Sequence, residues 1–161
     1  GSPPTEITFS SRFAKPYPPA QVEINGDPWY TVLTMEEAGA DETIALSWVH
    51  RNRVTQADLM VDHTEGNVTP EVGTTYTVKV YNASNTLVAT YAGITGTSWS
   101  YSKNQATIDS GSTTSNIESG YAILTTVRDG YDAWQSYRVD FQYRSTITAR
   151  SDLSLSWNIE N

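Results

Sequence analysis

Apolar and polar residues alternate along most of this chain, with the two-residue period of a strand that buries one face. The alternation is clearest where Ile44, Leu46, Trp48 and His50 would share a face. The same period predicts seven strands, at residues 21–25, 44–51, 76–80, 87–92, 98–101, 121–128 and 136–143. Asp129-Gly130 supplies the turn before the last strand. The pattern therefore predicts an all-β protein, a Greek-key sandwich of about seven strands.

Two long segments interrupt the alternation. Residues 53–73 would connect the second and third strands, and residues 103–120, which are rich in Ser, Thr, Asn and Gly, would connect the fifth and sixth. Loops longer than about 12–15 residues are uncommon in compact domains, and they are usually functional or mobile. We expect both segments to be loops and residues 109–119 to be mobile.

Several widely spaced fragments share their order and spacing with one known family. They are Phe13–Pro19, Leu46–Arg53, Gly73–Val78, Gly93–Trp99, and Val127–Gly130 followed by Trp134-Gln135. Together they resemble the fibronectin type III-like module found near the end of tail-tip or baseplate proteins of tailed bacteriophages and prophages. The resemblance implies a fibronectin type III/immunoglobulin-like sandwich, carried on the virion at the phage tail tip. It also implies partners: other tail proteins or neighbouring domains of the same chain, and a bacterial surface glycan or protein receptor.

The segments outside this module lead to a division of the chain into four parts. Gly1-Ser2 looks like the scar of a cleaved tag. Residues 3–15 are expected to be an extension from a preceding domain, residues 16–143 the sandwich, and residues 144–161 a further strand segment in which apolar residues alternate from Leu153 to Ile159. In the related modules the sandwich is close to complete by its final strand, so this last segment departs from the family.

Composition narrows the classes of function. The 161 residues carry a formal net charge of −8, and a polyanionic backbone would be repelled, so we expect no nucleic acid partner. The absence of cysteine excludes disulfides and thiolate chemistry. Because no apolar run approaches the roughly 20 residues of a membrane-spanning helix, we also expect no membrane insertion.

The chain offers little that resembles a catalytic centre. His50 and His63 are its two histidines, and the sequence has no nucleophile elbow, phosphate-binding glycine loop or zinc-protease motif. His50 shares a strand face with Trp48, which favours a histidine at the margin of the core that keeps one hydrogen bond. We therefore expect a protein that is not an enzyme.

One acidic segment has ligand-like chemistry. Asp58, Asp62 and Glu65 offer the hard oxygen donors that calcium prefers, and His63 would instead favour a transition metal. Their spacing matches neither an EF-hand nor a closed zinc site. A solvated acidic loop is the simpler interpretation, with a calcium site as the alternative.

Aromatic residues suggest a second kind of site. The strand patterns place five of the aromatic side chains in the core: Trp48, Tyr76, Tyr121, Tyr137 and Phe141. A further four would form platforms for sugar rings if they projected outward: Trp99, Tyr101, Tyr131 and Trp134. The simpler expectation is that Trp99 packs inward and that Trp134 plugs one end of the sandwich.

Three functions remain open at this stage. The preferred one is a non-catalytic structural and adhesive module, which acts as a spacer or touches the bacterial surface through loops such as residues 56–66 and 129–135. The second is a carbohydrate-binding module that uses exposed aromatic residues. The third is an assembly interface within the tail, formed by edge pairing of residues 5–12 and 152–161. The fold alone does not decide among them.

Overall fold

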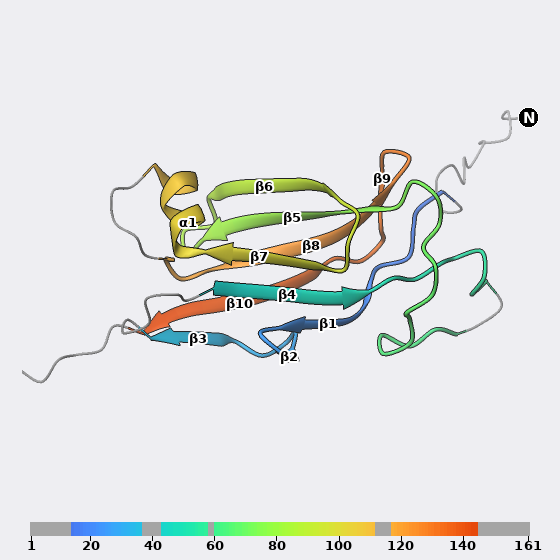
Figure 1. Ribbon diagram of the computed structural model, residues 1–161, viewed down its shortest axis with the longest axis horizontal. Coiled ribbons are helices and arrows are strands. Elements are labelled where there is room, and N and C mark those ends of the chain that lie inside the picture. Colours follow the sequence, from blue (N-terminus) through green and yellow to red (C-terminus); the bar gives the residue numbers. More distant parts are fainter. Residues whose placement is uncertain (1–13, 37–42, 58–59, 112–116, 145–161) are drawn as a thin grey trace, which may run out of the picture.

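The protein consists of two β-sheets that pack face to face, with one short helix at one end (Figure 1). The computed structural model describes residues 14–36, 43–57, 60–111 and 117–144. The first sheet has the strand order β2 (Asp27–Pro28), β1 (Ala20–Ile24), β4 (Thr43–Val49) and β7 (Ser98–Ser102). The second has the order β3 (Leu33–Glu36), β10 (Tyr137–Arg144), β8 (Gly120–Arg128), β5 (Thr75–Asn82) and β6 (Leu87–Ile94), with β9 (Tyr131–Asp132) paired to β8.

The strands expected from the alternation are all present, and the chain is an all-β, fibronectin type III/immunoglobulin-like Greek-key sandwich. The chain changes sheets between β2 and β3, β3 and β4, β4 and β5, β6 and β7, and β7 and β8. Asp129 and Gly130 both have positive φ angles, 52° and 78°, as the tight β8–β9 hairpin requires. The parallel pairing of β3 with β10 was not predicted, because four residues are too few to show a period.

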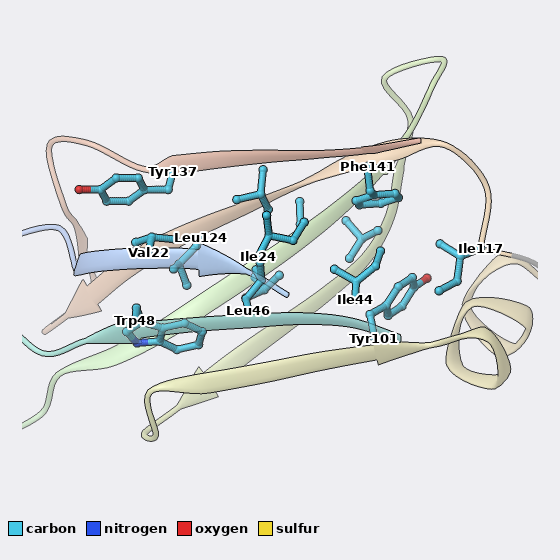
Figure 2. Close-up of a cluster of buried hydrophobic side chains, with 14 of the residues drawn as sticks. Val22, Ile24, Ile44, Leu46, Trp48, Tyr101, Ile117, Leu124, Tyr137 and Phe141 are labelled. Carbon is cyan, nitrogen blue, oxygen red and sulfur yellow. The ribbon is translucent and has the colours of Figure 1, made fainter. Parts of the chain in front are cut away.

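The core lies between the two sheets, and on β4, β5 and β10 it has the phase that the alternation predicts (Figure 2). In the first sheet Ile44, Leu46 and Trp48 point inward from β4. The second sheet contributes its own inward rows: Tyr76, Val78 and Val80 from β5, and Tyr137, Val139 and Phe141 from β10. Burying each large apolar side chain contributes about 1.5–3 kcal/mol, so these inward rows stabilise the packing of the two sheets.

The segment 103–120, expected to be a loop, contains the helix α1 (Lys103–Ser110) instead. The hydroxyl of Ser102 caps the helix by accepting a hydrogen bond from the backbone N–H of Gln105, at 3.2 Å. Gly111 ends it in the left-handed conformation, with φ 64°. The helix was missed because it has no apolar stripe: Ala106 is its buried residue.

Several sequence expectations fall outside the described residues. They concern the tag remnant and the extension before position 14, the alternating segment from Leu153 to Ile159, and residues 112–116 of the segment 109–119. The mobility expected for the described part of that segment stays a prediction. The described part of the other long segment, residues 53–57 and 60–73, contains no strand, so the loop expected there is confirmed for those residues.

Candidate functional site

Several loops meet at the end of the sandwich opposite α1 (Figure 1). They are the N-terminal segment 14–19, the described parts of the long loop 50–74, the turn 95–97 and the hairpin region 129–136. We call this surface the loop end. In sandwich domains loops cluster at the two ends of the sheets, where a rigid scaffold can present them.

The long loop is held in shape by two buried amide side chains. Asn52 donates from Nδ2 to the carbonyl oxygen of Thr69 at 2.9 Å, and its Oδ1 accepts from the backbone N–H groups of Val54 and Thr55 at 2.9 and 3.2 Å. The Oε1 of Gln56 accepts from the backbone N–H of Asn52 at 2.9 Å. Both amides are buried, and buried polar groups need such partners. The loop is therefore organised by its own sequence.

A buried carboxylate fixes the same loop to the neighbouring hairpin. Both oxygens of Glu71 accept from Nε of Arg53, at 3.0 and 2.9 Å. Nε of Arg128, at the end of β8, lies 3.4 Å from the same carboxylate and donates to the carbonyl oxygen of Val72 at 3.1 Å. The Glu71 side chain is only 7% exposed, so water screens these contacts weakly. The network ties the long loop to the end of β8, where the hairpin begins.

The loop is also attached to the first sheet. Gln21 has a φ of 48°, at a shift in the register between β1 and β4. This bulge turns its backbone N–H to the carbonyl oxygen of His63, at 2.9 Å, and its Nε2 to that of Thr64, at 2.7 Å. Nη2 of Arg51 donates to the carbonyl oxygens of Val61 and Asp62, at 2.6 and 2.7 Å.

The candidate metal ligands lie in this attached turn and bind one another. Oδ1 of Asp62 accepts from the backbone N–H and the hydroxyl of Thr64, both at 2.9 Å, and lies 3.1 Å from Nδ1 of His63. Oε2 of Glu65 accepts from the backbone N–H of Asp62 at 3.1 Å. The bond from the Thr64 N–H lowers the pKa of Asp62. These contacts give the carboxylates a role in shaping the turn.

The fourth candidate ligand, Asp58, lies outside the described residues. Within the ranges that are described, no group of three or more histidine or acidic side chains is placed to hold a metal ion.

Large apolar side chains are exposed on the loop end: Val54, Met60, Val72, Tyr131 and Trp134. The expectation that Trp134 plugs the sandwich is wrong, since its side chain is 60% exposed. Ala133 is the inward residue instead, and its backbone N–H donates to the carbonyl oxygen of Thr126 at 2.9 Å. Trp134 therefore points away from the core, with Nζ of Lys15 lying 4.5 Å from its ring centre.

The other two candidate aromatic residues lie apart from this surface. Tyr101 is only 2% exposed, and Trp99 is half-buried against the core, which confirms the inward packing expected for Trp99. Trp99 stacks on Tyr101 and contacts Tyr91, with ring centres 5.5 and 5.3 Å apart. The hydroxyl of Tyr91 donates to Asp109 in α1, and burial raises the pKa of both tyrosines. The cluster packs β6 against β7.

Tyr121 was expected in the core, and this expectation is wrong. On β8 the inward residues are Ala122, Leu124 and Thr126, so Tyr121 faces outward. There its ring stacks on that of Tyr81, with centres 4.9 Å apart and planes within 10°. Apolar residues occur on both faces of this strand, so the alternation did not identify which face points toward the core.

His50 lies where the sequence placed it, at the margin of the core. Its Nδ1 is 2.8 Å from the hydroxyl of Tyr76, and the two rings stack with centres 5.7 Å apart. Burial lowers the pKa of His50 and raises the pKa of Tyr76 to about 12. The expectation of a core-margin histidine with one hydrogen bond is confirmed.

Neither the scan against protein-family models nor the search of curated proteins returned a match. Among the described residues, the one helix is too short and too polar to cross a membrane.

Proposed function

We propose that this domain is a non-catalytic structural and adhesive module of the phage tail-tip type, whose loop end touches the bacterial surface. The observation that carries the proposal is the exposure of Val54, Met60, Val72, Tyr131 and Trp134 in the segments that form the loop end. Tryptophan, tyrosine and methionine are enriched at protein interfaces, where they fill pockets of the partner.

The support beneath these side chains strengthens the proposal. Binding costs less free energy when the contacting loops are already ordered. Here hydrogen bonds made by the Asn52 amide and the Glu71 carboxylate hold the long loop in one conformation. The resemblance to tail-tip modules adds the context: several copies on one particle would convert weak single contacts into firm attachment. A spacer role is the remaining alternative within the same class.

A binding assay with cells tests the proposal. The domain would be labelled and presented as a monomer and as an artificial multimer to a panel of Gram-negative cells. Trp134→Ala and Val72→Asp should each lower saturable binding by about tenfold or more, since truncating a central anchor costs about 2 kcal/mol. Ile108→Ala is the matched control, because Ile108 is an exposed apolar residue on α1, at the opposite end.

The outcomes separate the functions. Loss of binding in the two loop-end variants alone supports adhesion. Loss of binding to purified surface polysaccharide in folded Trp134→Ala would favour the carbohydrate-binding alternative. The exposure of Trp134 is the observation that supports this alternative. If the multimer binds no cells and no polysaccharide, the adhesive role is wrong, and a spacer or an assembly contact accounts better for the domain.

A further inference from the structure

A shallow groove crosses the outer face of the second sheet, on β10 and β8. Its volume is about 290 Å³, and its lining includes Val32, Asn85, Tyr121, Arg138, Asp140 and Gln142. None of these residues belongs to the loop end. The groove is near the lower limit of about 300 Å³ for small-ligand sites, so its size suits a short ligand segment.

The groove exists because two backbone segments approach closely beside it. Gly120 begins β8 opposite Asn82, and a Cβ atom at Gly120 would lie 2.1 Å from the carbonyl oxygen of Tyr81. Without that side chain the β5–β6 hairpin can form one wall. Oδ1 of Asn82 fixes the hairpin by accepting from the backbone N–H groups of Ser84 and Thr86, at 3.0 and 2.9 Å.

The opposite side of the groove is also fixed. Nε2 of Gln142 on β10 donates to the hydroxyl of Thr34 on β3 at 3.0 Å. Val32, just before β3, is 51% exposed and adds an apolar edge. The groove thus has two walls that do not depend on a ligand for their position.

The floor of the groove carries a stacked row of planar groups. The guanidinium carbon of Arg138 lies 3.8 Å from the ring centre of Tyr121, and Tyr121 stacks in turn on Tyr81. Arg138 is clamped by Asp140, to which Nη2 donates at 2.7 Å and Nε at 3.0 and 3.2 Å. Because both faces of Tyr121 are covered, the row presents its polar edges to the groove rather than a flat aromatic face.

The polar edges of this row present hydrogen-bond donors and acceptors, and together they carry no net charge. Arginine has five N–H donors, and the bonds to Asp140 use Nε and Nη2; within the described residues no hydrogen bond uses Nη1. Asp140 is about 40% exposed and keeps acceptor capacity, and the amides of Gln142 and Asn85 both donate and accept. The charges of Arg138 and Asp140 cancel, so the lining attracts neither anions nor cations strongly.

We propose that this groove binds a neutral, polyhydroxylated ligand, a segment of a glycan with adjacent hydroxyl groups. A hydroxyl donates and accepts at once, so two neighbouring hydroxyls match a carboxylate and a guanidinium held side by side. Because the paired charges of Arg138 and Asp140 cancel, the groove gives a charged ligand no net electrostatic attraction to offset its desolvation, which favours a neutral ligand. The site differs in place and in residues from the loop end, and the inference does not rest on the adhesive function proposed above.

Nuclear magnetic resonance titration of the ¹⁵N-labelled protein tests this assignment. The probes are neutral linear oligosaccharides of glucose, galactose, mannose and N-acetylglucosamine, each added to about 10 mM, ten times a dissociation constant of about 1 mM. At least one should shift the backbone amides of Asn85, Gly120 and Gln142 in a saturable way. Asp140→Asn should weaken that binding by about tenfold or more, because the amide loses the charge that clamps Arg138.

Two variants serve as controls. Asp27→Asn removes an exposed carboxylate from β2, in the other sheet, and should leave binding unchanged. Trp134→Ala changes the loop end and should also leave it unchanged. The spectrum of Asp140→Asn away from the groove would show that the variant is folded.

The results distinguish the two proposals. If no oligosaccharide shifts the groove amides, the groove assignment is overturned, whatever the cell assay gives. The same holds if the shifts lie on the loop end and disappear in Trp134→Ala but not in Asp140→Asn. Groove binding in a protein that fails to attach to cells would leave this inference standing and remove the adhesive function.

Discussion

His50 links the core of this protein to its long loop. Its ring contacts the buried hydroxyl of Tyr76, and its carbonyl oxygen accepts from the backbone N–H of Asn67 at 2.9 Å. Burial lowers the pKa of His50 below the usual 6.5. In the unfolded chain the same imidazole takes up its proton at a higher pH than in the folded protein.

The stability of the fold should therefore fall as the pH is lowered through 6.5 and towards the folded pKa of His50. In that range the unfolded state binds more protons, so the free energy of unfolding rises with pH. Urea denaturation at several pH values between 7.5 and 5 would measure this slope. His50→Gln should flatten it, because the variant lacks the imidazole whose pKa changes on folding. Equal slopes for the two proteins would show that His50 does not titrate differently on folding.

Gly120 is a second position where one residue decides local structure. Gly120→Ala should destabilise the protein by about 1–3 kcal/mol, because its Cβ would lie 2.1 Å from the carbonyl oxygen of Tyr81. Thermal unfolding measures the effect. Gly96→Ala is the matched control, since a Cβ there meets nothing within 4 Å, and it should be neutral or slightly stabilising. If Gly120→Ala left the thermal stability unchanged, the backbones of β5 and β8 would be able to move apart around the added Cβ.

At the scale of elements, the shape of the long loop depends on hydrogen bonds made by side-chain amides, whereas the strands are held by backbone hydrogen bonds to neighbouring strands. Asn52→Ala removes the donor to Thr69 and the acceptor for Val54 and Thr55, which should cost about 2–3 kcal/mol. Denaturant unfolding would give this value. Asn104→Ala, at an exposed position in α1, should change stability by less than about 0.5 kcal/mol. If the two variants were equally stable, the loop would owe its shape to other contacts.

The helix α1 shows how an element can form without a sequence period. It has a capping serine before it, a glycine after it, and one buried alanine between. The hydroxyl of Tyr91 on the edge strand β6 holds it in place through Asp109. Such a helix is stabilised by its caps, by the burial of Ala106 in the core and by the bond to Tyr91, because short helices are marginal without tertiary support.

At the scale of the molecule, Glu71 joins the loop between the two sheets to the last hairpin. Glu71→Gln should destabilise the protein by about 1.5–3 kcal/mol, because it weakens charge-assisted bonds to Arg53 and Arg128 inside the protein. It should also weaken cell binding in the adhesion assay by loosening the loop end. Asp129→Asn is the control: this exposed carboxylate lies 3.2 Å from the same Arg128 and should matter by less than about 1 kcal/mol. Comparable losses in the two variants would contradict the role given to Glu71.

The whole molecule therefore carries two separate candidate surfaces. The loop end presents apolar side chains on ordered loops, which fits a partner that offers pockets. The outer-sheet groove presents balanced donors and acceptors, which fits hydroxyl groups. Since the two surfaces share no residues, variants in one should leave binding at the other unchanged.

The sequence by itself determined the seven strands expected from the alternation and the class of fold. Alternation at Ile44, Leu46 and Trp48 reports burial directly, because successive side chains of a strand point to opposite faces. It also placed His50 at the core margin and Trp99 inward. These features depend on residues that are neighbours in the chain, so a local pattern records them.

The tertiary structure alone decided the sites. Tyr121 lies outside the core because Ala122 and Leu124 face the other sheet, and Trp134 is exposed because Ala133 takes the inward position. The parallel β3–β10 pair, the Glu71 network and the groove each join residues far apart in sequence. For Tyr121, Trp134 and Glu71, burial or exposure depends on which distant segment packs against the side chain, and the local period of the chain does not encode that contact.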